Sequence, residues 1–233
     1  STARPVTLSA NGGTFQTDAG TLELTGIVGG AYGALNKTGA GTLLLSNTNL
    51  YSGPTTVSAG TLKLGSGSAL GVSAAMGNRS VSPVTIEANG VLDLAGQTNF
   101  VGTFTLAGGR IADSVGGGAL GAYSFNVQSG SVEAVLADVT VPYAPNPSNR
   151  INLYKRSAGT VTLSATNLYS GHTFVEAGTL RVNGALPNSA VLIRTGGTLG
   201  GSGTLARTVN VEGGTLAPGA AANQPGTLSL GRH

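Results

Sequence analysis

The chain has 233 residues, of which 39 are glycine, 9 % are charged and 40 % are hydrophobic. This hydrophobic content argues against disorder, and the many glycines indicate a chain with many turns. Cysteine is absent, which excludes disulfides, zinc–thiolate sites and iron–sulfur clusters. The net charge of +3 is carried by single, scattered basic residues, so it does not predict nucleic-acid binding. No apolar run reaches the roughly 18 residues of a membrane-spanning helix, and we expect no direct membrane span.

The tripeptide Gly-Thr-Leu recurs along the chain and marks the predicted strands in order. It begins at Gly20, Gly41, Gly60, Gly178, Gly197, Gly203, Gly214 and Gly226. Positions 41 and 60, and likewise 178 and 197, are 19 residues apart. A short recurring period without helical spacing predicts an all-β solenoid with coils of roughly 19 residues. Glycine supplies the positive φ of a corner, and Thr-Leu begins the next strand.

Residues on either side of the leucines alternate between apolar and polar. Residues two apart share one face of a strand, so we expect the following to point into the core: Leu43, Leu45, Leu62, Leu64, Val161, Leu163, Leu180 and Val182. The same rule places the pairs 22 and 24, 92 and 94, 209 and 211, and 228 and 230 inside. Charged residues such as Glu23, Lys63, Asp93 and Arg181 fall between them and are predicted to face solvent.

Residues 35–64 and 153–182 are two copies of one unit. They align without a gap at an offset of 118, with 19 of 30 positions identical. The shared residues are turn formers and branched apolar residues, and neither copy carries a catalytic pattern. Lys37 and Lys155 are interpreted as exposed coil residues, and Tyr51 and Tyr169 as covers of a coil corner. Units of this kind bury their apolar face by stacking, so we expect residues 1–233 to form one continuous stalk.

The segment from Gly39 to Ser46, followed by Asn49 to Leu62, closely resembles the passenger-associated transport repeat of bacterial autotransporters (type V secretion). Its second copy runs from Ala158 to Val182. The resemblance implies a right-handed parallel β-helix on the outside of a Gram-negative cell, anchored through a C-terminal translocating barrel or released. In that family the chain emerges C-terminal part first, and folding of the stalk helps to draw the passenger through the pore.

Residues 138–152 interrupt the pattern with three prolines and three asparagines. Proline cannot donate to a parallel ladder, so this segment is predicted to loop out of the stalk. Exposed loops commonly carry binding residues. The predicted partner-binding residues are Tyr143, Asn146, Asn149 and Arg150, and host surface or serum proteins are the candidate partners.

Catalysis would have to use nine carboxylates and two histidines. Glu87 and Asp93 are the closest acidic pair on a plausible surface, and Glu133 and Asp138 are the next. Strand alternation predicts that all four are ordinary solvent-side charges, and His172 has no partner pattern of a hydrolase. We therefore expect no enzyme activity, no cofactor and no metal. The primary hypothesis is a structural portion of a secreted passenger. The alternative is an adhesin or host-protein-binding module, and a polysaccharide-cleaving enzyme is the third.

Overall fold

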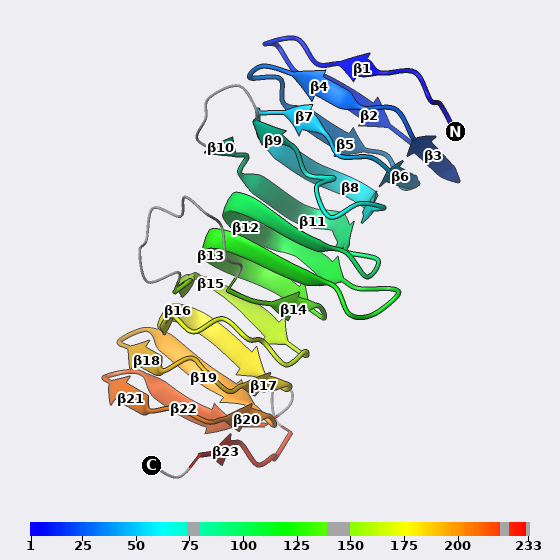
Figure 1. Ribbon diagram of the computed structural model, residues 1–233. Helices are drawn as coiled ribbons and strands as arrows, with labels where there is room; N and C mark the ends of the chain where they lie inside the picture. The colour runs from blue at the N-terminus through cyan, green and yellow to red at the C-terminus, as the bar shows by residue number, and fades with distance from the viewer. Residues whose placement is uncertain (74–79, 139–149, 220–223, 232–233) are drawn as a thin grey trace.

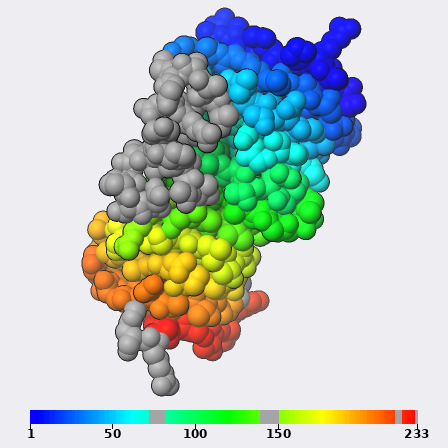
Figure 2. All heavy atoms as spheres, viewed as in Figure 1, coloured from blue at the N-terminus to red at the C-terminus, as the bar shows by residue number. Residues whose placement is uncertain are grey.

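The computed structural model describes residues 1–73, 80–138, 150–219 and 224–231. These residues form an all-β structure without a helix, in which parallel strands stack as a β-solenoid of about 10 turns. Figure 1 shows the strands following one another in chain order down the stack, and Figure 2 shows the same order as one elongated body. The predicted fold is therefore confirmed.

Most strands belong to one sheet of 15 strands. Its members are β2 (Gly13–Gln16), β3 (Thr21–Leu24), β5 (Leu35–Thr38), β6 (Thr42–Leu45), β8 (Thr55–Leu64), β11 (Val84–Asp93), β12 (Thr98–Ala112), β13 (Ala119–Val132), β14 (Val135–Leu136), β15 (Leu153–Leu163), β16 (Thr173–Val182), β18 (Val191–Arg194), β19 (Gly197–Gly201), β21 (Val209–Glu212) and β22 (Thr215–Pro218). The long strands bend at a corner, so that one strand contributes to two faces of a coil. Thus the first part of β8 pairs with β5 and its last part pairs with β6.

Shorter strands close the coils on a third side. One three-stranded sheet contains β1 (Val6–Thr7), β4 (Val28–Gly30) and β7 (Leu50–Tyr51), and another contains β17 (Ala185–Leu186), β20 (Thr204–Leu205) and β23 (Ser229–Leu230). A separate antiparallel pair joins β9 (Val72–Ser73) and β10 (Ser80–Val81). Each coil of the repeats therefore has three faces and three corners.

A single hydrophobic core runs through the stack from Leu8 to Leu205. The eight residues assigned to the core by alternation all have an exposed fraction of 0 %: Leu43, Leu45, Leu62, Leu64, Val161, Leu163, Leu180 and Val182. Two inward predictions are wrong, because Val211 is 52 % exposed and Leu230 is 50 % exposed. Both lie in strands at the end of their sheets, β21 and β23, where no following strand covers them within the described part of the chain.

On the face that contains Leu43 the register between the two repeats shifts by two residues, whereas on the preceding face Leu35 and its equivalent Leu153 share one ladder. Leu43 aligns in the ladder with Leu62, Leu92, Ile111, Val132 and finally Leu163. The sequence equivalent of Leu43 is Val161, at the offset of 118, and Val161 lies opposite Gly130. The largest irregularity lies between β13 and β15, where the pairs Asn126–Tyr154 and Gly130–Val161 leave three more residues in β15 than in β13. A shift of two keeps every side chain on its own face, because strand alternation has a period of two.

Candidate functional site: the buried corners of the repeats

The corner between β5 and β6 is closed from inside by a lysine. Lys37 has an exposed fraction of 0 %, and its ammonium donates three hydrogen bonds to backbone carbonyls. The acceptors are the carbonyl oxygens of Thr38 at 2.7 Å, Gly39 at 2.8 Å and Ala59 at 3.1 Å. Ala59 belongs to β8, the strand of the following coil. The lysine therefore joins two successive corners of the stack.

The second repeat places the same group at the same corner. Lys155 in β15 is also fully buried and donates to the carbonyl oxygen and hydroxyl of Ser157. Its third acceptor is the carbonyl oxygen of Ala177 in the following coil, at 3.0 Å. Three acceptors match the three donors of an ammonium group, so two main-chain carbonyls and one hydroxyl satisfy the buried charge.

Burial lowers the pKa of both lysines below the ordinary value of 10.5, because an enclosed site disfavours the charged form. At Lys37 the negative charge of Asp18 acts in the opposite direction. The expectation that these lysines are exposed is therefore wrong. Strand alternation by itself predicts that Lys37 is buried, because Leu35 is buried and residue 37 lies two positions further on the same face.

The corner before β7 holds a buried asparagine. Asn49 accepts a hydrogen bond from the amide of Val28 in the preceding coil at 2.8 Å and donates to the carbonyl of Ala69 at 2.8 Å. Its equivalent, Asn167, accepts from the amide of Leu136 at 2.9 Å. Both side chains thus replace missing ladder hydrogen bonds, and unpaired backbone groups at these enclosed corners would be costly.

The third corner contains a tyrosine and a threonine. The hydroxyls of Tyr51 and Thr55 are 2.8 Å apart across the turn between β7 and β8, and those of Tyr169 and Thr173 are 2.7 Å apart. All four residues are fully buried. Burial raises the pKa of both tyrosines, because the phenolate would lose its hydration. The tyrosines close the corner from within the core.

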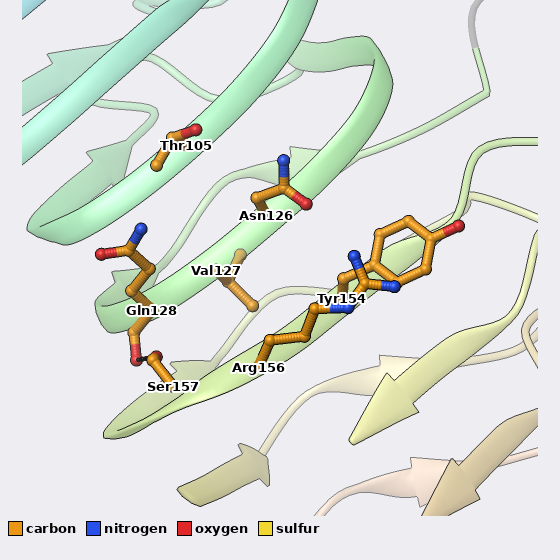
Figure 3. Close-up of a pocket in the computed structure, with 7 residues that line it drawn as sticks. All are labelled: Thr105, Asn126, Val127, Gln128, Tyr154, Arg156 and Ser157. Atoms are coloured by element: carbon orange, nitrogen blue, oxygen red, sulfur yellow. Dashed lines mark hydrogen bonds between the residues drawn. The ribbon is translucent and has the colours of Figure 1, made fainter. Parts of the chain in front are cut away.

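A shallow groove of about 340 Å³ lies on the outside of the stack beside the second repeat. Figure 3 shows the residues that line it: Thr105, Asn126, Val127, Gln128, Tyr154, Arg156 and Ser157. The lining contains amides, hydroxyls and one guanidinium, with no carboxylate. A pair of acid and base groups for glycoside or ester hydrolysis is therefore missing from this groove.

The aromatic residues beside this groove are covered by their neighbours. The rings of Tyr154 and Phe174 stack with centroids 5.2 Å apart. The guanidinium of Arg156 lies 4.0 Å from the centroid of Tyr154, and that of Arg194 lies 5.2 Å from the centroid of Phe174. Glu176 binds both arginines, each at 2.6 Å. This network holds β15, β16 and β18 together from outside.

The predicted partner-binding loop is only partly described. Tyr143, Asn146 and Asn149 lie outside the described residues, whereas Arg150 is exposed. The carboxylate of Asp138 accepts hydrogen bonds from the amides of Ile151 at 3.1 Å and Ser170 at 2.9 Å. These bonds connect the two bases of the loop to the stack.

A second depression, of about 290 Å³, adjoins Arg150. It is lined by Arg150, Ser170, Gly171, His172, Asn188, Ala190, Arg207 and Thr208. The lining contains two arginines, one histidine and no carboxylate. This depression is more basic than the groove beside Tyr154, whose lining contains one arginine.

Asp93 differs from its prediction as a solvent-side charge, being only 6 % exposed. Its carboxylate accepts hydrogen bonds from the amides of Ala95 and Ser114 and from the hydroxyl of Ser114, and it lies 3.5 Å from the ammonium of Lys63. Although burial opposes ionisation, these hydrogen bonds and Lys63 hold the pKa of Asp93 below its ordinary value. The carboxylate therefore supports a turn. Glu87 is exposed, as predicted.

The described residues contain no cluster of three or more acidic, histidine or cysteine side chains suited to a metal ion. Within the same residues, no helix is long and apolar enough to cross a membrane.

Comparison with known proteins identifies the repeat. The passenger-associated transport repeat family matches residues 35–64 and 153–182. The adhesin BmaC autotransporter of Brucella suis biovar 1 (strain 1330) is 34 % identical over 192 residues, which cover 75 % of this chain and 5 % of that protein. The chain thus spans a small part of its relative's length. No solved structure matches. The family match and the match to the adhesin together extend over most of the chain. The chain is therefore part of an autotransporter passenger, which is displayed at the cell surface or released.

Proposed function

We propose that this segment is a structural, non-enzymatic part of the passenger, and that stacking of its coils supports secretion across the outer membrane and display at the cell surface. The expected partner is the translocating barrel of the same protein. The main support is the set of buried corner contacts. Lys37 and Lys155 each use a carbonyl of the following coil, and Asn49 bonds to the coils on both sides.

These contacts make each coil dependent on its neighbours. In a stacked array, stability is the sum of each unit and its interfaces, so one damaged coil weakens the growth of the next. A passenger that emerges with its C-terminal part first would add each new coil onto a folded one. Folding on the outer side would then oppose backward movement through the pore.

The test uses the intact parent protein and four core variants. Val161→Asp and Leu180→Asp damage the second repeat, and Leu43→Asp and Leu62→Asp damage the equivalent positions of the first. We expect the two variants nearer the C-terminus to reduce the amount of surface-exposed passenger more strongly. Protease accessibility on whole cells measures the passenger.

The matched control is Thr162→Asp, which introduces the same charge next to Val161 on the outward side of β15. The amount of barrel inserted in the membrane must be equal in all strains. Normal display by all four core variants would contradict a role of the coils in secretion and leave them as a passive spacer.

We also propose a second function, adhesion to a host surface or serum protein. Two observations favour it: the relative is named an adhesin, and the depression lined by Arg150, His172 and Arg207 is basic. The proposed contact combines this depression with Tyr143, Asn146 and Asn149 of the adjoining loop. An acidic partner would complement it.

Binding of the purified chain to host cells tests this second proposal. Arg207→Ala is expected to weaken binding, and binding should fall as salt increases because exposed charges are screened. Arg4→Ala, an exposed arginine at the other end of the stack, is the control. Equal binding by both variants would exclude the basic depression as the contact. Turnover of a polysaccharide by the chain would contradict the non-enzymatic assignment.

A further inference from the structure

The inner face of the stack contains a column of apolar residues that two lysines interrupt. In the first half the register partners are Phe15, Lys37, Val57, Ile86, Leu106 and Val127, and in the second half they are Lys155, Val175, Ile193 and Val211. Each repeat thus contributes one ammonium group to a column otherwise filled by valine, isoleucine, leucine and phenylalanine. Hydrophobic packing alone gives no reason for a lysine at this place.

The carbonyls around each lysine are brought together by a glycine in the following coil. Gly60 has a φ of +66°, and a side chain there would lie 2.3 Å from the carbonyl oxygen of Gly39. Gly178 has a φ of +65°, and a side chain there would lie 2.3 Å from the carbonyl oxygen of Ser157. Gly39 and Ser157 both supply acceptors to the lysine. The lysine of one coil and the glycine of the next therefore meet at one corner.

The chain needs a device that fixes its register. A slip of one residue would move apolar residues to the outside, but a slip of two would keep all of them inside. A displacement of two exists in this structure, because Leu43 shares a ladder with Leu163, two residues beyond its sequence equivalent Val161. The alternating pattern of Gly-Thr-Leu coils therefore does not distinguish the correct pairing from one displaced by two residues.

We propose that Lys37 and Lys155 specify the register between the two coils of each repeat. A slip of two residues would move the ammonium roughly 7 Å along the strand from its one acceptor in the following coil, the carbonyl of Ala59 for Lys37 or of Ala177 for Lys155. Leaving a buried charge without one of its acceptors is costly, whereas an apolar residue would tolerate the slip. A single buried asparagine fixes the register of coiled coils in the same way. The proposal refines the proposed function, because correct stacking is what that function requires.

The reporter of register is a pair of engineered cysteines in a chain that has none. Asn36 and Thr56 are register partners on the outer face of β5 and β8. Cysteines at these positions would be about 5 Å apart between Cα atoms, which permits a disulfide. Cysteines at 36 and 58 would be roughly 8 Å apart in the native register, which prevents one, and would become partners after a slip of two.

The full chain is refolded in a thiol–disulfide buffer, and the fraction of each cross-link is measured. With Lys37 present, the 36–56 link should exceed the 36–58 link by at least about tenfold, since a slipped chain loses an acceptor of the buried charge. In Lys37→Met this preference should fall to within about threefold, because the apolar side chain no longer distinguishes the registers. An unchanged preference in Lys37→Met would overturn the proposal.

Leu43→Ala is the matched control. It removes apolar packing from the same coil and leaves the acceptors of Lys37 intact, so it should lower stability and retain the native link. A loss of preference in this control equal to that in Lys37→Met would show that register follows general stability and would also overturn the proposal. If Lys37→Met does not fold, Lys37→Gln carries the test: its neutral amide should give a preference below that of the parent, and an unchanged preference would again overturn the proposal.

The two proposals can fail separately. Normal surface display by the core variants, together with a register that depends on Lys37, would remove the secretion role and retain the register role. Reduced display by those variants, together with a native link in Lys37→Met, would do the reverse.

Discussion

The hydroxyl of Tyr51 lies 2.8 Å from that of Thr55, inside a corner that solvent does not reach. The second repeat contains the same pair, but there the hydroxyl of Thr173 also lies 2.7 Å from that of Ser189. The two copies thus share the tyrosine–threonine pair, but only in the second copy does the threonine have a serine hydroxyl as an additional hydrogen-bond partner.

This difference predicts unequal effects of removing the phenol hydroxyl. Tyr51→Phe should lower the free energy of unfolding by about 1–3 kcal/mol, because it takes a partner from the buried hydroxyl of Thr55. Tyr169→Phe should cost less, since Thr173 retains Ser189. Urea denaturation measures both, and equal losses would contradict the prediction. Tyr51→Phe combined with Thr55→Val should cost less than the sum of the two single changes.

The same tyrosines predict a loss of stability at high pH. Their pKa is raised in the folded state above the ordinary value of 10.0. Above pH 10 the unfolded phenols lose their protons while the folded ones keep them, so unfolding releases protons. Each buried tyrosine should lower the free energy of unfolding by about 1.4 kcal/mol per pH unit in this range.

Lys37 and Lys155 change the free energy of unfolding with pH in the opposite direction to the tyrosines. Their pKa is lowered in the folded state, so the free energy of unfolding rises from that lowered value up to 10.5 and then stays constant. Above pH 10.5 the tyrosine effect therefore dominates. Denaturation at a series of alkaline pH values measures the slope, and Tyr51→Phe with Tyr169→Phe should remove it. A slope that persists in the double variant would assign the alkaline effect to other groups.

Gly60 and Gly20 offer a matched pair for testing close contact at a corner. Their φ angles are nearly equal, +66° and +67°, so alanine meets the same backbone strain at both. A side chain at Gly20 meets no atom within 4 Å, whereas one at Gly60 would lie 2.3 Å from the carbonyl oxygen of Gly39.

Gly20→Ala should therefore cost about 1–2 kcal/mol, the price of a left-handed conformation. Gly60→Ala should cost at least about 3 kcal/mol, because the corner must also move away from Lys37. Chemical denaturation provides both values. Similar losses for the two alanine variants would show that the corner adapts freely.

Leu45 and Leu44 test which face of the strand is inside. Leu45 is fully buried, and Leu44 lies outward between Glu23 and Lys63 in the ladder. Leu45→Asp should destabilise the chain by at least about 3 kcal/mol, since its carboxylate has no partner in the apolar core. Leu44→Asp should stay within about 1 kcal/mol. Thermal melts followed by circular dichroism compare them, and equal losses would contradict the assignment of faces.

Alternation in the sequence predicts much of this architecture because it reports the faces of a strand directly. It places Leu43, Leu45, Val161 and Leu163 inside, where the structure has them. The same alternation also places Lys37 inside with Leu35, but the usual exposure of lysine led to the opposite expectation. A sequence does not reveal that three carbonyls converge on the ammonium, because that depends on how the next coil turns.

Other features depend on neighbours that a strand pattern does not contain. Asp93 lies between two inward leucines and is outward by alternation, yet the turn at Ser114 covers it. Val211 is inward by alternation and exposed because β21 is the last strand of its sheet. The register shift at Val161 is invisible to a pattern of period two.

The acceptors of Lys37 and Lys155 have a consequence for how such stalks lengthen. All but one are main-chain carbonyls, the exception being the hydroxyl of Ser157. Main-chain carbonyls are present whatever the side chain at their position. The glycine whose turn brings them close to the lysine lies in the same 30 residues as the lysine. A tandem duplication of that gene segment therefore copies donor, acceptors and corner together. New length can be added without a compensating mutation elsewhere in the protein.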